Sequence, residues 1–284
     1  MKIEKNVRLN DKLRKAYNNL SEKTFGINFE EWYQAGYWGE KHIPYSIMDG
    51  DVMAANVSVN VIDMVWNGQK KKFIQLGTVE TAESYRKKGY SRLIMEEILK
   101  DYEGKCDGFF LFANDTVLNF YPKFGFQKID EFHYYKNVNI NGDSSIEKVD
   151  MKNESMRNSF VQAIKESRLF SKFDASANFE LIMFYAGGFM SENVYYDKYS
   201  DTYVIAELEN EEIVIYGCFS KENVSVDDVV EKFGGHINKI TLGYVPVDVE
   251  EYHIEKIIEE DTTLFVRGFD FREEKLMFPL LAHS

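Results

Sequence analysis

The sequence predicts a mixed α/β protein built from two domains. Its 284 residues suffice for two domains of ordinary size, and 44% of them are apolar, so both can bury a core. Strand-like and helix-like patterns alternate along the chain, which is typical of a sheet flanked by helices. A polar run, NINGDSS at 139–145, separates two such series. We therefore predict one domain over residues 1–138 and a second over 146–284.

The first half begins with helical patterns and continues with strands on both sides of a further helix. The dipeptide Asp49-Gly50 lies between two apolar runs and is a strong hairpin signal. The expected elements are helices over 11–20 and 28–36, the two strands of the hairpin, a strand in KKFIQLGTVET, an amphipathic helix over 90–102, a buried strand in CDGFFLFA, a short helix over 115–123, and one or two strands in GFQKIDEFHYYKNV.

The second half shows a similar order of elements. Ser225, with Asp228 three residues later, is typical of a helix N-cap. We expect helices near 151–169 and 176–186, strands near 193–199, 202–208 and 212–219, a helix in SVDDVVEKF, strands in KITLGYV and TLFVRGF, and a helix near 250–259. The order echoes the first half without a residue-level repeat, which suggests a degenerate duplication.

The composition argues for a cytoplasmic protein without a metal centre. No apolar run approaches the roughly 18 residues of a membrane span, and charges throughout the first thirty residues exclude a signal peptide. Cys106 and Cys218 are far apart in the sequence, which fits a reducing compartment. The five histidines are scattered without the spacing of metal ligands. We expect no membrane association, and the oligomeric state is left open.

The acidity of the chain belongs to its second half. Residues 1–140 hold 20 Lys and Arg against 19 Asp and Glu, whereas residues 141–284 hold 14 against 28. This excess is either a solvated surface or a negative field that attracts a cationic substrate. The chain has no broad basic surface, so we do not expect nucleic-acid binding.

A basic loop, RKKGYS at 86–91, joins a predicted strand to the helix over 90–102. A helix N-terminus presents unpaired N–H groups that bind phosphates readily, and Gly89 lets the backbone approach a ligand closely. Arg86, Lys87, Lys88 and Arg92 add attraction for an anion. The loop is either an anion site or a solvated turn. It matches neither the Walker A nor the Rossmann pattern.

Two segments together resemble the GCN5-related N-acetyltransferase (GNAT) family. The stretch 76–99 contains Arg86-x-x-Gly89-x-Ser91, similar to the family loop [RQ]-x-x-G-x-[GA], with serine in the last place. The stretch 113–129, ANDTVLNFYPKFGFQKI, is similar to the second family signature. The resemblance covers roughly residues 1–138 and implies a GNAT fold, a central mixed twisted sheet flanked by helices.

The resemblance implies that acetyl-CoA lies in a V-shaped opening between two parallel strands. Its pantetheine arm would pair with backbone near Val79 and Thr81, and Asn114 would reach the same arm. Its pyrophosphate would bind backbone N–H groups in the loop, so that the implied cofactor residues there are Arg86, Lys87, Lys88, Gly89, Tyr90, Ser91 and Arg92.

Acetyl transfer to an amine needs a neutral nucleophile and a proton for the leaving thiolate. Tyr121 matches the family tyrosine that acts as general acid; otherwise it is an aromatic core residue. Glu80 lies on the strand beside the expected acetyl group and is the candidate base, or else an exposed strand carboxylate. The tail LMFPLLAHS offers a second candidate, the carboxylate of Ser284.

The predicted activity is acetyl-CoA-dependent N-acetylation of a primary amine on a small cationic molecule or a peptide. The alternative is a non-catalytic sensor that binds acyl-CoA. The aromatic segment 29–38 either walls the acceptor site, with Glu30 and Glu31 pairing with an ammonium, or forms a helix packed on the sheet. The second half lacks a basic glycine loop, and Asp227 and Asp228 would repel a pyrophosphate there. We expect this acidic domain to shape the acceptor site instead.

Overall fold

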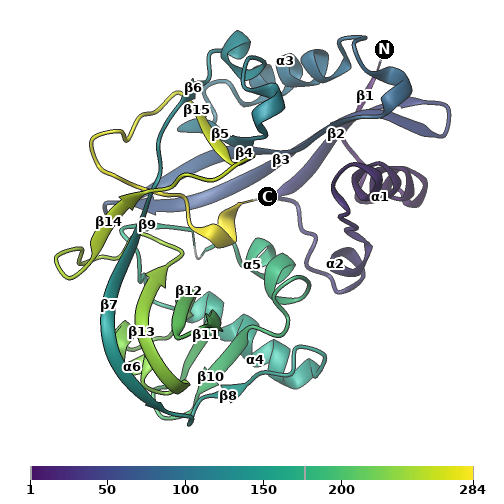
Figure 1. Ribbon diagram of the computed structural model, residues 1–284. Helices are drawn as coiled ribbons and strands as arrows, with labels where there is room; N and C mark the ends of the chain where they lie inside the picture. The colour runs from purple at the N-terminus through teal and green to yellow at the C-terminus, as the bar shows by residue number, and fades with distance from the viewer. Residues whose placement is uncertain (1, 176, 284) are drawn as a thin grey trace.

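The computed structural model describes residues 2–175 and 177–283 and contains two twisted sheets with helices packed against them (Figure 1). The predicted mixed α/β architecture is confirmed. Within the described residues the first sheet has eight strands, which are, in spatial order, β1 (Ile3–Glu4), β2 (His42–Asp49), β3 (Val52–Trp66), β4 (Gln69–Thr81), β5 (Gly108–Ala113), β15 (Thr263–Arg267) and β6 (Gln127–Lys128), with β9 (Phe173–Asp174) paired to β3.

The second sheet and the helices come mainly from the second half of the chain. Among the described residues its seven strands are, in spatial order, β14 (His253–Lys256), β7 (Phe132–Asp143), β13 (Gly234–Leu242), β12 (Glu212–Phe219), β11 (Thr202–Glu209), β10 (Val194–Asp197) and β8 (Glu147–Lys148). The α-helices are α1 (Asp11–Phe25), α2 (Glu30–Gln34), α3 (Tyr90–Tyr102), α4 (Glu154–Glu166), α5 (Phe179–Ala186) and α6 (Val226–Val230).

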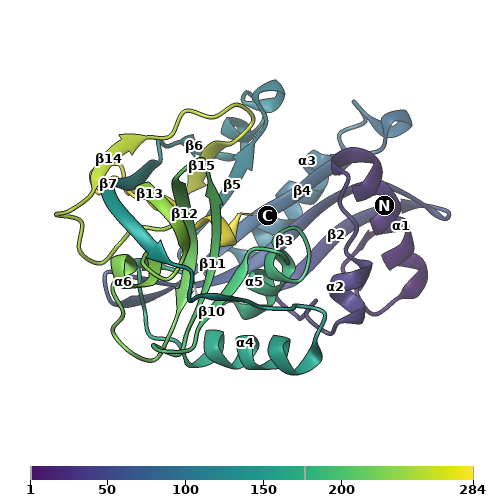
Figure 2. The same cartoon turned by 60° about the horizontal axis from the view of Figure 1, so that its bottom comes forward.

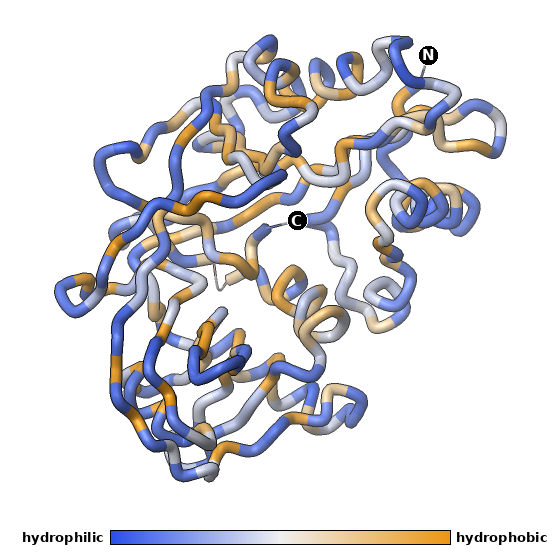
Figure 3. The backbone as a smooth tube through the Cα atoms, viewed as in Figure 1, coloured by the Kyte–Doolittle hydropathy of each residue, from blue (hydrophilic) through white to orange (hydrophobic). Residues whose placement is uncertain are grey.

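The two long helices of the first half pack on its sheet through their apolar faces. Helix α1 begins where the Asn10 side chain accepts from the N–H groups of Lys12 and Leu13, and it ends at Gly26 in the left-handed conformation. Helix α3 buries Ile94 and Ile98 among the apolar residues of β3, β4 and β5. Apolar residues follow the strands, while the outer loops are mostly hydrophilic (Figure 3). Burial of these apolar faces fixes both helices against the sheet.

The hairpin predicted at Asp49-Gly50 is confirmed, whereas the helix predicted near 250–259 is wrong. There the structure has strand β14, which pairs antiparallel with residues 132–135 of β7. All four residues of β14 are exposed, so a helix in this place would bury no apolar face. The open edge of β7 instead offers backbone hydrogen-bond partners, and the strand satisfies them.

The chain passes between the two sheets more than once. Strand β7 runs through residues 139–143, the start of the predicted boundary, and joins the second sheet. Near the C-terminus, β15 returns to the first sheet and lies between β5 and β6 (Figure 2). One apolar cluster includes residues of both sheets, among them Phe73 and Val204, together with Phe278 near the C-terminus. The division into 1–138 and 146–284 stays a prediction, and the halves share strands and core.

The strand order of the second half resembles that of the first. In the first half, β3 and β4 pair antiparallel, α3 follows, and β5 lies parallel to β4. In the second, β11 and β12 pair antiparallel, α6 follows, and β13 lies parallel to β12. This shared order supports the suggestion of a degenerate duplication.

Candidate active site

The first sheet opens at the end of its only parallel strand pair among the described residues. Strands β4 and β5 pair from Phe73 with Gly108 to Gln75 with Phe110. Beyond that point β4 continues to Thr81 and β5 to Ala113 without pairing to each other. The predicted V-shaped opening therefore lies between residues 76–81 and 111–113.

A β-bulge lies in β4 at this opening. The register places Gly77 opposite Ser58 and Glu80 opposite Asn56, so that Thr78 and Val79 together face Val57. Thr78 has a φ of 40°, which is unusual for a β-branched residue. Bulges re-aim side chains and often lie beside active sites.

A cavity of about 570 Å³ occupies the opening. Among its lining residues are six that the sequence singled out: Val79, Thr81, Arg86, Ser91, Asn114 and Tyr121. Lys87, Lys88, Gly89, Tyr90 and Arg92 are not among the lining residues; they lie in the loop and first helical turn beside the cavity. The site is therefore long enough for an extended arm and ends at the start of α3.

The start of α3 fits an anionic group. Gly89 precedes the helix with a φ of 82°, and no side chain caps the first turn, so its N–H groups lack a protein partner there. A Cβ on Gly89 would meet nothing within 4 Å, so the approach is open. The Ser91 hydroxyl lies 2.7 Å from that of Thr81, and this contact holds the helix start against β4. These features match the requirements of a pyrophosphate.

Tyr121 lies at the wall of the cavity with its ring buried and is 3% exposed. The ring contacts Phe126 and Phe265, at centroid distances of 6.3 and 5.7 Å. Burial raises the pKa of its phenol to about 12, so the group holds its proton near neutral pH. The phenol therefore stays protonated, as a proton donor must be, although the raised pKa also makes it a weaker acid.

Glu80 lies on the face of β4 that packs against α1. Its side chain is 2% exposed and accepts a hydrogen bond of 2.9 Å from the Ser21 hydroxyl. Burial raises the pKa of its carboxyl to about 8. Glu80 is not among the lining residues of the cavity in the opening or of the one beside it. Its role as base stays a prediction.

A second cavity, of about 310 Å³, adjoins the first and is built by both halves of the chain. The two cavities share Ile27, Gly77, Thr78 and Phe112, so they meet at the bulge. We call the second one the acceptor cavity. Its other lining residues are Phe29, Trp32, His42, Asn60, Leu181, Phe184, Tyr185, Phe189, Thr262 and His283.

The aromatic segment 29–38 contributes to the acceptor cavity in part. Phe29 and Trp32 line it, while Trp38 is buried in the core cluster beside α1. Glu30 does not face it freely, because its carboxylate accepts from Arg14 at 2.9 Å. The sequence missed the residues of α5 and the C-terminal turn, which follow Glu30 by some 150 positions or more and have no local signature. His283 lines the cavity, and Ser284 lies outside the described residues.

A buried chain of hydrogen bonds leads away from the point where the cavities meet. Thr78 Oγ1 donates to Ser58 Oγ at 2.5 Å, and Tyr17 Oη lies 3.0 Å from Ser58 Oγ. Tyr17 Oη in turn lies 3.1 Å from His42 Nε2. His42 Nδ1 is 2.6 Å from Asn60 Oδ1, which holds the ring in one tautomer. Burial lowers the pKa of His42 to about 4, so its imidazole is neutral.

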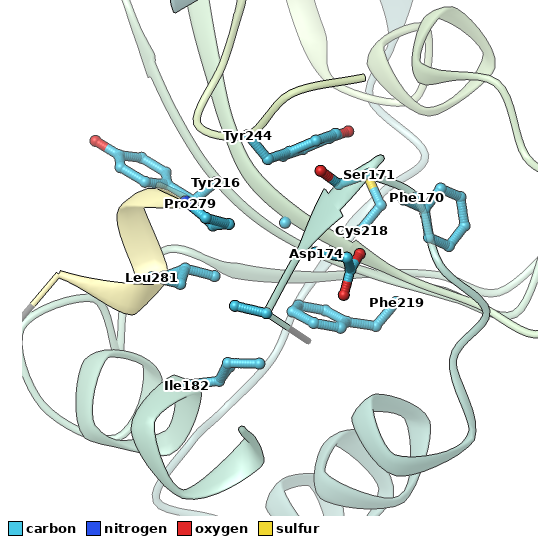
Figure 4. Close-up of a pocket in the computed structure, with 12 residues that line it drawn as sticks. Phe170, Ser171, Asp174, Ile182, Tyr216, Cys218, Phe219, Tyr244, Pro279 and Leu281 are labelled. Carbon is cyan, nitrogen blue, oxygen red and sulfur yellow. The ribbon is translucent and has the colours of Figure 1, made fainter. Parts of the chain in front are cut away.

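The second sheet has a corresponding opening that the chain itself fills. Strands β12 and β13 pair only as far as Ile215 with Leu242, although β12 continues to Phe219. The Leu280 N–H donates to the Gly243 carbonyl at 2.8 Å, and the last turn of the chain lies there. Only about 40 Å³ remains, and Pro279 and Leu281 lie along its wall (Figure 4). That the second half does not bind CoA stays a prediction.

Neither a metal cluster nor a membrane helix is found within the described parts of the chain. Over residues 2–175 and 177–283, no three or more His, Cys, Asp or Glu side chains gather as metal ligands would. In the same ranges, no helix has the length and apolar character needed to cross a membrane.

The splayed parallel strands, the helix start facing them and the buried tyrosine define an acyltransferase. Residues 7–129 match the family model described as an acetyltransferase (GNAT) domain. Residues 7–129 therefore form a GNAT acetyltransferase domain, as the two signatures indicate. None of the curated proteins compared with it matches.

Solved structures share the fold over nearly the whole chain. A probable N-acyltransferase of unknown function from Enterococcus faecalis V583 is 13% identical, with a TM-score of 0.57 over 94% of this chain and 72% of its own. A GCN5-related N-acetyltransferase from Kribbella flavida is also 13% identical, with a TM-score of 0.56 over 94% and 70%. One from Anabaena variabilis ATCC 29413 is 15% identical, with a TM-score of 0.53 over 91% and 71%. The likeness thus extends over both halves.

Proposed function

We propose that the protein transfers the acetyl group of acetyl-CoA to a primary amine of a small molecule or peptide. The observation that carries this proposal is the meeting of two cavities at the bulge of β4. One runs to the uncapped start of α3, as a CoA thioester requires, and the other is open to a second substrate. A protein that only sensed acyl-CoA would need the first cavity alone.

In the proposed reaction the neutral amine attacks the thioester carbonyl carbon where the cavities meet. A C–N bond forms, the C–S bond breaks, and the departing thiolate takes the proton of Tyr121. The amine loses one proton as the thiol gains one, so the net charge balances. The sequence predicts Glu80 as the acceptor of that proton, although its side chain lines neither cavity. Backbone N–H groups near Val79 would stabilise the oxyanion. The thiols Cys106 and Cys218 are unpaired, which supports the proposed cytoplasmic location.

Release of free CoA thiol across a panel of primary amines tests the proposal. We expect amine-dependent thiol release together with an N-acetylated product of 42 Da added mass by mass spectrometry, a difference that follows from acetyl replacing hydrogen. Tight CoA binding without thiol release on any amine would favour the sensor instead.

A further inference from the structure

The acceptor cavity has an apolar, aromatic wall and an uncharged polar floor. Phe29, Trp32 and Phe184 gather at its side, with Phe29 and Phe184 stacked at a centroid distance of 5.5 Å. The polar side chains that line it are His42, Asn60, Thr78, Tyr185, Thr262 and His283, and burial lowers the pKa of both histidines to about 4. No carboxylate side chain is among the described lining residues.

Glu30 and Glu180 adjoin this wall in the sequence but are not among its lining residues, although Glu180 lines a smaller cavity that shares Trp32 and His42 with it. Glu30 pairs with Arg14 at 2.9 Å and also accepts from Asn18 at 3.1 Å. Glu180 contributes its backbone carbonyl, which accepts from Trp32 Nε1 at 2.9 Å and ties α2 to α5. The acidic side chains of the second half are therefore not among the described lining residues of the cavity that this half helps to build.

We infer that the acceptor is a monoamine on an apolar or aromatic body and not a polycation. This inference rests on the proposed acetyl transfer. The reacting nitrogen enters neutral and reaches the floor at Thr78, while its apolar body contacts the aromatic wall. Among the described lining residues a second ammonium would find no carboxylate as counter-charge, and burial of an unpaired charge is strongly unfavourable. The aromatic rings also offer stacking partners for a substrate ring.

Two amines of matched length test this inference. n-Hexylamine and 1,5-diaminopentane differ by a methyl group replaced with an ammonium group. We expect kcat/KM for thiol release to be at least about tenfold higher with the monoamine, and phenethylamine to be better still. Equal values, or a preference for the diamine, would overturn the inference while thiol release itself still supported acetyl transfer. Absence of release with every amine would reject the proposed function and this inference together.

A variant at the rim of the cavity provides a second measurement. Phe189 is 65% exposed, so its replacement does not remove a core residue. We expect Phe189→Glu to raise the relative activity on the diamine several-fold over Phe189→Gln, which has the same shape without the charge. No difference between the two variants would contradict the inference that missing counter-charge sets the preference.

The buried hydrogen-bond chain supports a second inference on independent grounds. Its members can all donate in one direction, from Thr78 to Ser58, then Tyr17, then His42. Asn60 accepts from Nδ1–H, so Nε2 is free to accept the last proton of the series. Thr78 lines both cavities and is the member that a bound amine would contact.

The geometry points to this series of hydrogen-bonded side chains as the route by which the amine loses its proton. Thr78 takes a proton from the nitrogen as the C–N bond forms and passes its own to Ser58, and each member repeats the step until Nε2 of His42 holds the proton. After the thiol has left, the same hydroxyls carry the proton back to water in the acceptor cavity and Tyr121 regains a proton from water, so the enzyme returns to its starting state. A weak base suffices, because the nitrogen becomes acidic once it is bonded to the carbonyl carbon. Tyr17 and His42 act through Thr78 and are positioning residues for this transfer.

Removal of one hydroxyl interrupts the hydrogen-bond series and leaves the packing of the side chains in place. We expect Tyr17→Phe to lower kcat at least about tenfold, with unchanged acetyl-CoA affinity. The matched control is Tyr45→Phe. It removes a buried hydroxyl that donates to Asp101 at 2.8 Å and does not belong to the hydrogen-bond series. The proton inventory of kcat in mixed H₂O and D₂O should be curved in the wild type and linear in Tyr17→Phe.

Two outcomes would overturn the relay. One is a kcat for Tyr17→Phe equal to that of Tyr45→Phe. The other is a strong loss in Glu80→Gln with none in Tyr17→Phe, which would place the base at Glu80. In both cases thiol release by the wild type would still support the proposed function.

Discussion

Tyr121 shows how distant parts of the chain prepare a single side chain. Phe126 follows it closely in the sequence, whereas Phe265 belongs to β15 near the C-terminus. Together they keep the phenol out of water, and burial alone raises its pKa to about 12. The result is a phenol that stays protonated at the wall of the cavity.

We predict that Tyr121→Phe lowers kcat roughly 100-fold, because the thiolate would leave without a proton donor. Stability should change little, since the ring contacts with Phe126 and Phe265 are kept. Thiol release and thermal unfolding measure the two effects. Tyr134→Phe is the control: it removes a buried hydroxyl that donates to the Lys275 carbonyl at 2.8 Å, away from the cavities. Wild-type kcat in Tyr121→Phe would contradict the acid role.

Glu80 shows where reasoning from the sequence stops. Its position on the strand was predictable, but its direction was not, because strand alternation assumes a regular ladder. The bulge at Thr78 and Val79 breaks that alternation one residue before Glu80. No local sequence pattern predicts the bulge. The sequence therefore could not show that the Glu80 carboxylate lies against α1.

At the scale of elements, the start of α3 was the most predictable part of the site. Its loop, its glycine and its helix are contiguous in the sequence, so the residues that act together are neighbours in the chain. The opening between β4 and β5 was implied by the family resemblance and not by the local sequence. The acceptor cavity was not predictable in this way, since α5 reaches it through tertiary packing.

A pair of glycine variants separates conformational strain from cofactor binding. Gly89 and Gly104 flank α3, both have positive φ, and a Cβ on either meets nothing within 4 Å. We predict that Gly89→Ala and Gly104→Ala each cost about 1 kcal/mol of unfolding free energy. Only Gly89→Ala should weaken acetyl-CoA binding, by roughly fivefold to tenfold, because it alters the N–H groups of the first turn. Calorimetric titration measures this, and equal affinities in the two variants would contradict it.

At the scale of the molecule, the two halves are not structurally independent units. Strand β15 fills a place in the first sheet between β5 and β6, although it follows them by more than a hundred residues. A linear reading of hydrophobic periodicity identifies such a strand but not its partners, since pairing is set by long-range packing. Most of the polar run that the sequence predicts as a boundary therefore lies within strand β7.

We predict that a chain ending at residue 150 does not fold into a competent acetyltransferase domain. It would lack β15, leave β5 with an unpaired edge and expose the apolar ring of Tyr121. The expected result is aggregation, with no cooperative thermal transition and no acetyl-CoA binding. A soluble fragment that melts cooperatively and binds acetyl-CoA would show that the first half stands alone.

The turn at Leu280–Ala282 has a consequence for how many substrates one chain can hold. The turn lies at the end of the β12–β13 pair, the place that corresponds to the opening between β4 and β5 in the first sheet. Residues of the protein itself therefore fill this opening. The opening in the second sheet is thus filled, whereas the opening in the first sheet is the proposed binding site. The same turn carries His283 to the acceptor cavity. With the first opening as the proposed acetyl-CoA site, we expect saturation at one acetyl-CoA per chain, because the opening in the second sheet is already occupied.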